Sequence, residues 1–148
     1  MREVIRPLRP DDVDEVIRVW LESTIPGQSF LPEPHWRSME PVIRGQLMPV
    51  ADTWVVEEGS QIVAFMSLLD DLIGGLFTLP EHQGRGHGRR LVEHAQRLHD
   101  PLFVEVFEAN EPAVRFYKGR GFVDAERKLD ETGLHLLILR LEAGGTED

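Results

Sequence analysis

Cysteine is absent from the 148-residue sequence, which excludes disulfide bonds, thiolate metal sites and a thiol nucleophile. This absence fits a reducing compartment. Long apolar runs are also missing, because no window approaches the roughly 20 apolar residues of a membrane-spanning helix. The opening stretch MREVIRPLRPDD has no apolar segment of the secretory type. We therefore expect a cytoplasmic protein with no membrane partner.

Positive charge is scarce as well: 16 lysines and arginines face 26 aspartates and glutamates, for a formal net charge of −10. Nucleic-acid binding needs a basic surface, so the composition argues against a nucleic-acid partner. A length of 148 residues suits one domain with a core of its own. We expect a single domain over residues 1–141 and a polar tail over residues 142–148.

The apolar pattern predicts a sheet of several strands. Alternation or short apolar runs between turn residues predict strands over residues 3–9, 53–57, 61–69, 72–79, 102–107, 122–129 and 134–141. Helical segments separate some of these strands. The predicted fold class is therefore α/β or α+β, with a mixed sheet and helices on both faces.

Helical spacing predicts four helical regions. The first follows Pro10 and has Asp11 or Asp12 as its N-cap. The second covers about residues 35–48, where Pro41 is expected to break it into two pieces or kink it. The third follows the glycine-rich stretch and ends near His99, and the fourth covers residues 111–118. The proline-rich residues 25–34 are expected to form a loop.

The stretch HQGRGHGRRL, residues 82–91, places three glycines at alternate positions between a predicted strand and a predicted helix. This spacing matches neither the nucleotide P-loop nor the GxGxxG dinucleotide fingerprint. Helix N-termini offer free N–H groups and partial positive charge, and glycines let the backbone wrap an anion. The loop therefore favours a pyrophosphate ligand. The alternative is a glycine-rich turn that binds nothing.

A second stretch, NEPAVRFYKGRGF at residues 110–122, follows another predicted strand. Asn110 can cap a helix here, and Ala113, Phe116 and Tyr117 share one helix face. Together the two stretches resemble the GNAT superfamily of acyl-CoA-dependent N-acetyltransferases, in its small single-domain bacterial type. The predicted element order fits the fold of that family over about residues 3–141.

The resemblance implies a central mixed sheet of about six or seven strands flanked by about four helices. The fourth and fifth strands would splay apart around the pantetheine arm of acetyl-CoA, with Gly74 and Gly75 as the local source of a bulge. The residues implied in acetyl-CoA binding are Leu76, Phe77, Thr78, Gly84, Arg85, Gly86, His87, Gly88, Arg89 and Asn110.

The resemblance also implies direct transfer of an acetyl group to a primary amine of a small molecule or peptide. Tyr117, the only tyrosine, would be the general acid that protonates the leaving thiolate. Glu105 is the candidate base, although a solvent-facing strand glutamate fits its position equally well. Asp70, Asp71 and His35 are rivals, and a water chain would need no single base. The rival function is a non-catalytic acyl-CoA-binding regulatory module.

The acceptor side is less specified by the sequence. The resemblance implies an acceptor pocket built by the helices after the first strand and by the turn before the last one. Its candidate residues are Phe30, His35 and Trp36, with Glu33, Asp130 and Glu131 as attractors of a cationic amine. The alternative is that these are core aromatics and solvated charges. The six histidines lack metal-ligand spacing, so no metal is expected. Homodimers are frequent in the family, but the sequence specifies no interface.

Overall fold

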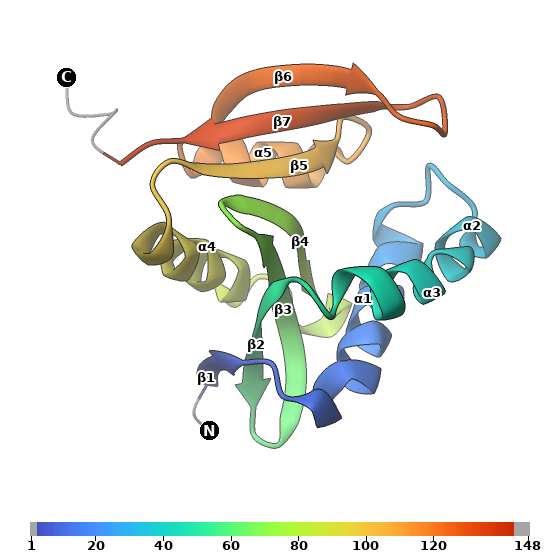
Figure 1. Ribbon diagram of the computed structural model, residues 1–148, viewed down its shortest axis with the longest axis vertical. Coiled ribbons are helices and arrows are strands. Elements are labelled where there is room, and N and C mark those ends of the chain that lie inside the picture. Colours follow the sequence, from blue (N-terminus) through green and yellow to red (C-terminus); the bar gives the residue numbers. More distant parts are fainter. Residues whose placement is uncertain (1–2, 144–148) are drawn as a thin grey trace.

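The computed structural model describes residues 3–143 and is built around one seven-stranded sheet (Figure 1). Residues 144–148 of the predicted tail lie outside the described residues. The strands are β1 (Glu3–Pro7), β2 (Asp52–Glu58), β3 (Gln61–Leu69), β4 (Leu72–Thr78), β5 (Leu102–Phe107), β6 (Val123–Leu129) and β7 (His135–Leu141). They lie in the order β1-β2-β3-β4-β5-β7-β6, and β4 with β5 is the parallel pair.

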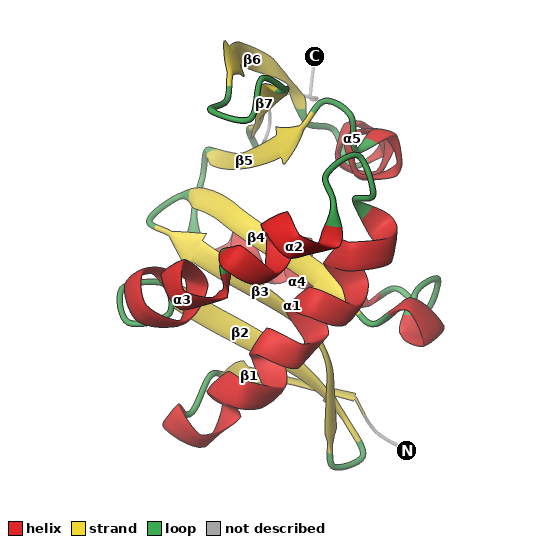
Figure 2. Ribbon diagram, turned by 90° about the vertical axis from the view of Figure 1, so that its right-hand side faces the viewer, coloured by secondary structure: helices red, strands yellow, loops and turns green. Residues whose placement is uncertain are grey.

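The helices cover both faces of this sheet, as predicted from the sequence. They are α1 (Val13–Gly27), α2 (Glu33–Ser38), α3 (Glu40–Val42), α4 (His87–Leu98) and α5 (Glu111–Gly119). Figure 2 shows α1, α2 and α3 in front of the sheet, α4 behind it, and α5 against β5. The core lies between these layers, where Val16 and Trp20 of α1 are buried with Phe65 and Met66 of β3. No helix within residues 3–143 is long and apolar enough to cross a bilayer.

Asp12 is the N-cap residue of α1, as predicted, but its side chain does not cap that helix. Pro10–Asp12 form a 3₁₀ turn, and the Asp12 carboxylate makes no cap bond to α1. It accepts hydrogen bonds instead from the Arg9 backbone N–H at 2.7 Å and from the Arg6 guanidinium at 2.8 and 3.2 Å. The predicted N-cap position is therefore confirmed, but the carboxylate bonds to Arg6 of β1 and closes the 3₁₀ turn at Arg9 instead of capping α1.

The predicted loop over residues 25–34 is shorter than expected. Helix α1 continues to Gly27 with Pro26 inside its last turn, and the Gln28 N–H bonds to the Thr24 carbonyl at 2.8 Å. Pro26 has no backbone N–H to donate, but the helix tolerates this loss near its end because Gln28 still closes the last turn. The break predicted at Pro41 is confirmed: α2 ends at Ser38, and α3 is followed by a π-helical turn over Ile43–Leu47.

The sheet opens between β4 and β5. These strands pair only at Leu72 with Phe103 and at Ile73 with Val104, and then diverge. The register of β4 against β3 shifts at the same place, since Leu68 pairs with Ile73 whereas Ser67 pairs with Gly75. Gly74 is the extra residue, which confirms the predicted bulge. A bulge turns β4 away from β5, so the parallel pairing ends there and a cleft can form.

Candidate active site

The glycine loop has a separate structural reason for each glycine. Gly84 and Gly86 adopt left-handed backbone angles, with φ of 82° and 88°, and Gly86 is the N-cap of α4. Gly88 lies where an added Cβ would be 3.3 Å from the Phe116 ring, so it allows α4 and α5 to approach closely. The first N–H groups of α4 have no partner inside the helix, which makes the loop suited to an anion.

Behind this loop lies a cluster of charged side chains that the sequence did not predict. Glu58, at the end of β2, lies 3.0 Å from His82 Nδ1, 3.2 Å from Arg85 Nη1 and 3.2 Å from His87 Nε2. Burial alone would raise the pKa of Glu58, but the basic side chains of His82, Arg85 and His87 beside it, with the hydrogen bond from His87, lower it below its ordinary value. The cluster therefore ties the β2–β3 hairpin to the loop.

Two of these side chains have defined roles within the cluster. His87 is buried, and its Nδ1 lies 3.2 Å from Arg90 Nη2. A guanidinium only donates, so Nδ1 accepts and His87 Nε2 donates to Glu58. Glu58, His82 and His87 are metal-binding residue types with ligand atoms within 4.8 Å. The Arg85 guanidinium already lies within 3.2 Å of Glu58 and of His82, so a cationic group is present in this cluster.

Two pockets lie where β4 and β5 splay apart: an inner pocket lined by both strands, and a loop pocket lined by β4, the glycine loop and α5. The loop pocket has a volume of about 480 Å³ and runs along the glycine loop and α5. The inner pocket has a volume of about 190 Å³ and lies among α1, α2, β4 and β5. The residues that line both are Gln28, Leu76, Phe77, Asn110, Ala113 and Tyr117. A molecule in one pocket can therefore touch a molecule in the other.

The loop pocket gathers most of the residues predicted to bind acetyl-CoA. Its lining includes Leu76, Phe77, Thr78, Gly84, Gly86, His87, Gly88, Arg89 and Asn110. Arg85 is not part of that lining, because its side chain turns back to Glu58. Asn110 caps α5 as predicted, accepting a hydrogen bond from the Ala113 N–H at 3.4 Å.

Tyr117 lies where the two pockets meet. Its side chain is 5% exposed, and its ring packs edge-on against Phe116 and Phe122 with centroids 5.2 and 5.4 Å away. Burial raises the pKa of the Tyr117 phenol well above its ordinary value. The hydroxyl therefore keeps its proton at neutral pH and can donate it.

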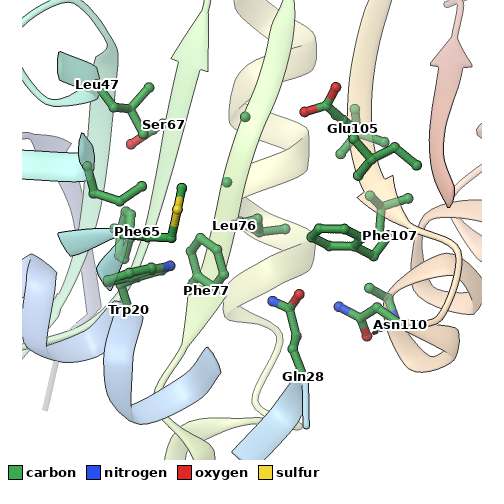
Figure 3. A pocket seen from close by; sticks show the side chains of 18 of the residues that line it. Trp20, Gln28, Leu47, Phe65, Ser67, Leu76, Phe77, Glu105, Phe107 and Asn110 are labelled. Atoms are coloured by element: carbon green, nitrogen blue, oxygen red, sulfur yellow. Dashed lines mark hydrogen bonds between the residues drawn. The ribbon is translucent and has the colours of Figure 1, made fainter. Parts of the chain in front are cut away.

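Glu105 is the only carboxylate among the described residues that line the inner pocket. It comes from the face of β5 that also carries Phe107, and Figure 3 shows both side chains beside the cleft, across from Leu76 and Phe77. Its Oε2 lies 3.2 Å from Lys128 Nζ of β6. The rival bases Asp70, Asp71 and His35 do not line this pocket.

The walls of the inner pocket are mainly apolar. Trp36 lines it as predicted, whereas Phe30 and His35 do not; their ring centroids are 6.4 and 5.1 Å from that of Trp36. Phe107 was missed by the sequence reasoning. Its ring lies 5.4 Å from Phe30 and 6.2 Å from Trp36. The period-two pattern of β5 could have identified it, because Phe107 shares a face with Glu105.

The charged candidates on the acceptor side also lie outside the lining of the inner pocket. Glu33 pairs with Arg37 at 2.7 Å. Asp130 accepts hydrogen bonds from Thr132 Oγ1 and from its backbone N–H, and these lower the pKa of Asp130 together with the charge of His35.

Comparison with known proteins agrees with this arrangement. A sequence model described as an acetyltransferase (GNAT) domain matches residues 49–124, which is more than half of the chain. The chain belongs to the GNAT acetyltransferase family. It is thus an N-acetyltransferase, an enzyme that transfers an acetyl group to an amine, and acetyltransferases of this family take that group from acetyl-CoA.

Similar curated proteins cover nearly the whole of this acetyltransferase. The peptidyl-lysine N-acetyltransferase YiaC of Escherichia coli K12 is 32% identical over 92% of this chain and 94% of its own. The peptidyl-lysine N-acetyltransferase YjaB of the same organism is 36% identical over 93% of this chain and 94% of its own. The solution structure of apo YjaB from E. coli superposes with a TM-score of 0.84 at 34% identity, covering 95% and 97% of the two chains.

Proposed function

We propose that this acetyltransferase moves the acetyl group of acetyl-CoA directly to the side-chain amine of a lysine in a peptide or protein. The observation that carries the proposal is the meeting of the two pockets at Tyr117, with Glu105 on the wall of the inner one. The names of the similar YiaC and YjaB proteins support a peptidyl lysine as the acceptor. A family of named transferases also favours catalysis over a non-catalytic binding module.

The loop pocket is the proposed site for acetyl-CoA. Main-chain N–H groups from Gly84 to Arg89 would hold the pyrophosphate at the N-terminus of α4. The splayed strand β4 would offer main-chain groups of Leu76, Phe77 and Thr78 to the pantetheine arm and the acetyl group. Asn110 would face that arm from the start of α5.

The inner pocket is the proposed channel for the lysine side chain. Its apolar wall, including Trp36 and Phe107, suits a chain of four methylene groups and disfavours the charged ammonium form. A free lysine amine has a pKa of about 10.4, so a base is needed at neutral pH. Glu105 is the proposed base because it is the carboxylate of that wall.

Glu105 and Tyr117, the two titratable groups that line the inner pocket, account for both protons that move in the transfer step. The neutral amine attacks the thioester carbonyl, so a C–N bond forms as the C–S bond breaks. The amine proton goes to Glu105, directly or through water. Tyr117 gives its phenolic proton to the sulfur as the C–S bond breaks, and the phenolate then regains a proton through solvent. A thiol of the cysteine type has an ordinary pKa of about 8.5, below that of a phenol, so the proton transfer has to accompany the bond breaking and cannot wait for a free thiolate.

An acceptor panel tests this proposal. Purified enzyme and acetyl-CoA are incubated with a peptide whose one internal lysine is free and whose N-terminus is blocked. The matched control peptide has a free N-terminus and a blocked lysine, and a small diamine is the third acceptor. We expect acetylation of the internal lysine, located by fragmentation mass spectrometry. Acetylation confined to the N-terminus or to the diamine would contradict a lysine acceptor.

The cytoplasmic location and the homodimer stay predictions, and light scattering tests the homodimer.

A further inference from the structure

Lys128 of β6 forms an ion pair with the candidate base, Glu105 of β5. Strand β7 lies between β5 and β6, and pairs Glu105 with Ile138 and Lys128 with Leu136. The Lys128 side chain crosses β7 diagonally, and its Nζ lies 3.2 Å from Glu105 Oε2. Leu136 and Glu105 both line the inner pocket. The amine of Lys128 is thus at the rim of the proposed acceptor channel.

The 3.2 Å between Lys128 Nζ and Glu105 Oε2 is the separation that an acceptor amine needs from the base. A general base works within about 2.6–3.2 Å of the atom whose proton it removes. Lys128 Nζ already meets that condition at Glu105 without any rearrangement. About half of the Lys128 side chain is exposed, so its four-carbon stem has room to swing toward the thioester.

The rest of the chain offers a matched internal comparison. The sequence holds only two lysines, Lys118 and Lys128. All the other residues in its total of lysines and arginines are arginines. Lys118 is on α5 and pairs with Asp124 at 3.1 Å, and neither of these two residues lines the inner pocket. Lys128 is therefore the only lysine of the sequence placed at the candidate base.

We propose that Lys128 is a self-acetylation site, modified by the enzyme's own active site within one molecule. The inference rests on the proposed function, because it uses the same pocket and base. The neutral Nζ of Lys128 attacks the thioester carbonyl, the C–N bond forms and the C–S bond breaks. The amine proton goes to Glu105, and the leaving thiolate takes its proton from Tyr117. Acetylation removes the charge of Lys128 and with it the ion pair to Glu105.

Mass spectrometry of the full chain incubated with acetyl-CoA alone tests this inference. We expect one acetyl group per molecule at Lys128, added about 10²-fold faster than at Lys118, at a rate per molecule that does not change with protein concentration. Lys128→Arg should abolish this modification and Lys118→Arg should leave it intact. Both variants keep the charge and therefore the ion pairs.

The other outcomes each overturn the inference. Equal acetylation of the two lysines, or an equal rate in Tyr117→Phe, would indicate chemical rather than enzymatic modification. A rate that rises with protein concentration would indicate transfer between molecules. An unmodified Lys128 in an enzyme that still acetylates the lysine peptide would refute self-acetylation alone. Failure of both reactions would instead refute the proposed function.

Discussion

Glu105 and Tyr117 line the same inner pocket, one from β5 and the other from α5. Their surroundings differ in the way that acid–base chemistry needs. Tyr117 is buried among aromatic rings and keeps its proton, whereas Glu105 is partly exposed and pairs with a cation. A buried phenol and a carboxylate that face one cavity are a frequent arrangement for an acid and a base in one site.

Removing the Tyr117 hydroxyl should slow turnover without weakening acetyl-CoA binding. In Tyr117→Phe the ring still packs on Phe116 and Phe122, but no proton donor remains at the junction of the pockets. We expect kcat to fall about 10²- to 10⁴-fold. Steady-state kinetics on a lysine peptide measures this, and calorimetry with acetyl-CoA is the control for binding. Unchanged kcat would remove Tyr117 from the acid role.

Shortening Phe107 should affect the acceptor but not the donor. Its ring lines the inner pocket and packs on Phe30 and Trp36. We expect Phe107→Ala to raise the KM for the lysine peptide about tenfold or more, and to leave the KM for acetyl-CoA close to its original value. Phe103→Ala, on the same strand but outside that lining, is the matched control. Equal effects of both changes would show that they act through the sheet.

Neutralising Glu58 should loosen the glycine loop. Its carboxylate holds His82, Arg85 and His87 at the base of that loop. We expect Glu58→Gln to raise the KM for acetyl-CoA about tenfold, as for the loss of a charged hydrogen bond, with kcat little changed. Glu57→Gln on the same strand, which contacts Arg6 instead, is the control. A fall in kcat at constant KM would contradict a role in donor binding.

The ion pair between Arg6 and Asp12 should make stability depend on pH. The hydrogen bond from Arg6 is the main reason that the pKa of Asp12 lies below its ordinary value of about 3.9. The folded state therefore gains stability above about pH 4 and loses that gain as the pH falls through the lowered pKa.

Urea unfolding at two pH values checks this expectation. We expect Asp12→Asn to reduce the free energy of unfolding by about 1–3 kcal/mol at pH 7, because it leaves Arg6 underpaired. The difference from the original protein should shrink at acidic pH. Asp11→Asn, at an exposed neighbouring position, should change stability by less than about 0.5 kcal/mol. A difference that is constant with pH would exclude the charge of Asp12 as its cause.

The sequence predicted those features that local pattern determines. The glycine loop, the capping by Asn110 and the bulge at Gly74 depend on neighbours along the chain. Long-range contacts were not predictable in the same way. Glu58 reaches His87 only through the register of the β2–β3 hairpin and the position of α4, and Lys128 reaches Glu105 only because β7 lies between β5 and β6. Asp12 occupies the predicted N-cap position of α1, but its ion pair with Arg6 was not predictable, because the turn after β1 brings the two side chains together.

Glu105 is proposed to deprotonate a lysine amine in the inner pocket. The pH dependence of kcat/KM for the lysine peptide tests it most directly, with Glu105→Gln compared to the original enzyme. We predict that the original enzyme reaches a plateau below the pKa of about 10.4 of a free lysine amine. The Glu105→Gln variant should instead keep rising about tenfold per pH unit toward that value, because only the deprotonated peptide would react. Identical pH profiles for the two enzymes would contradict the claim.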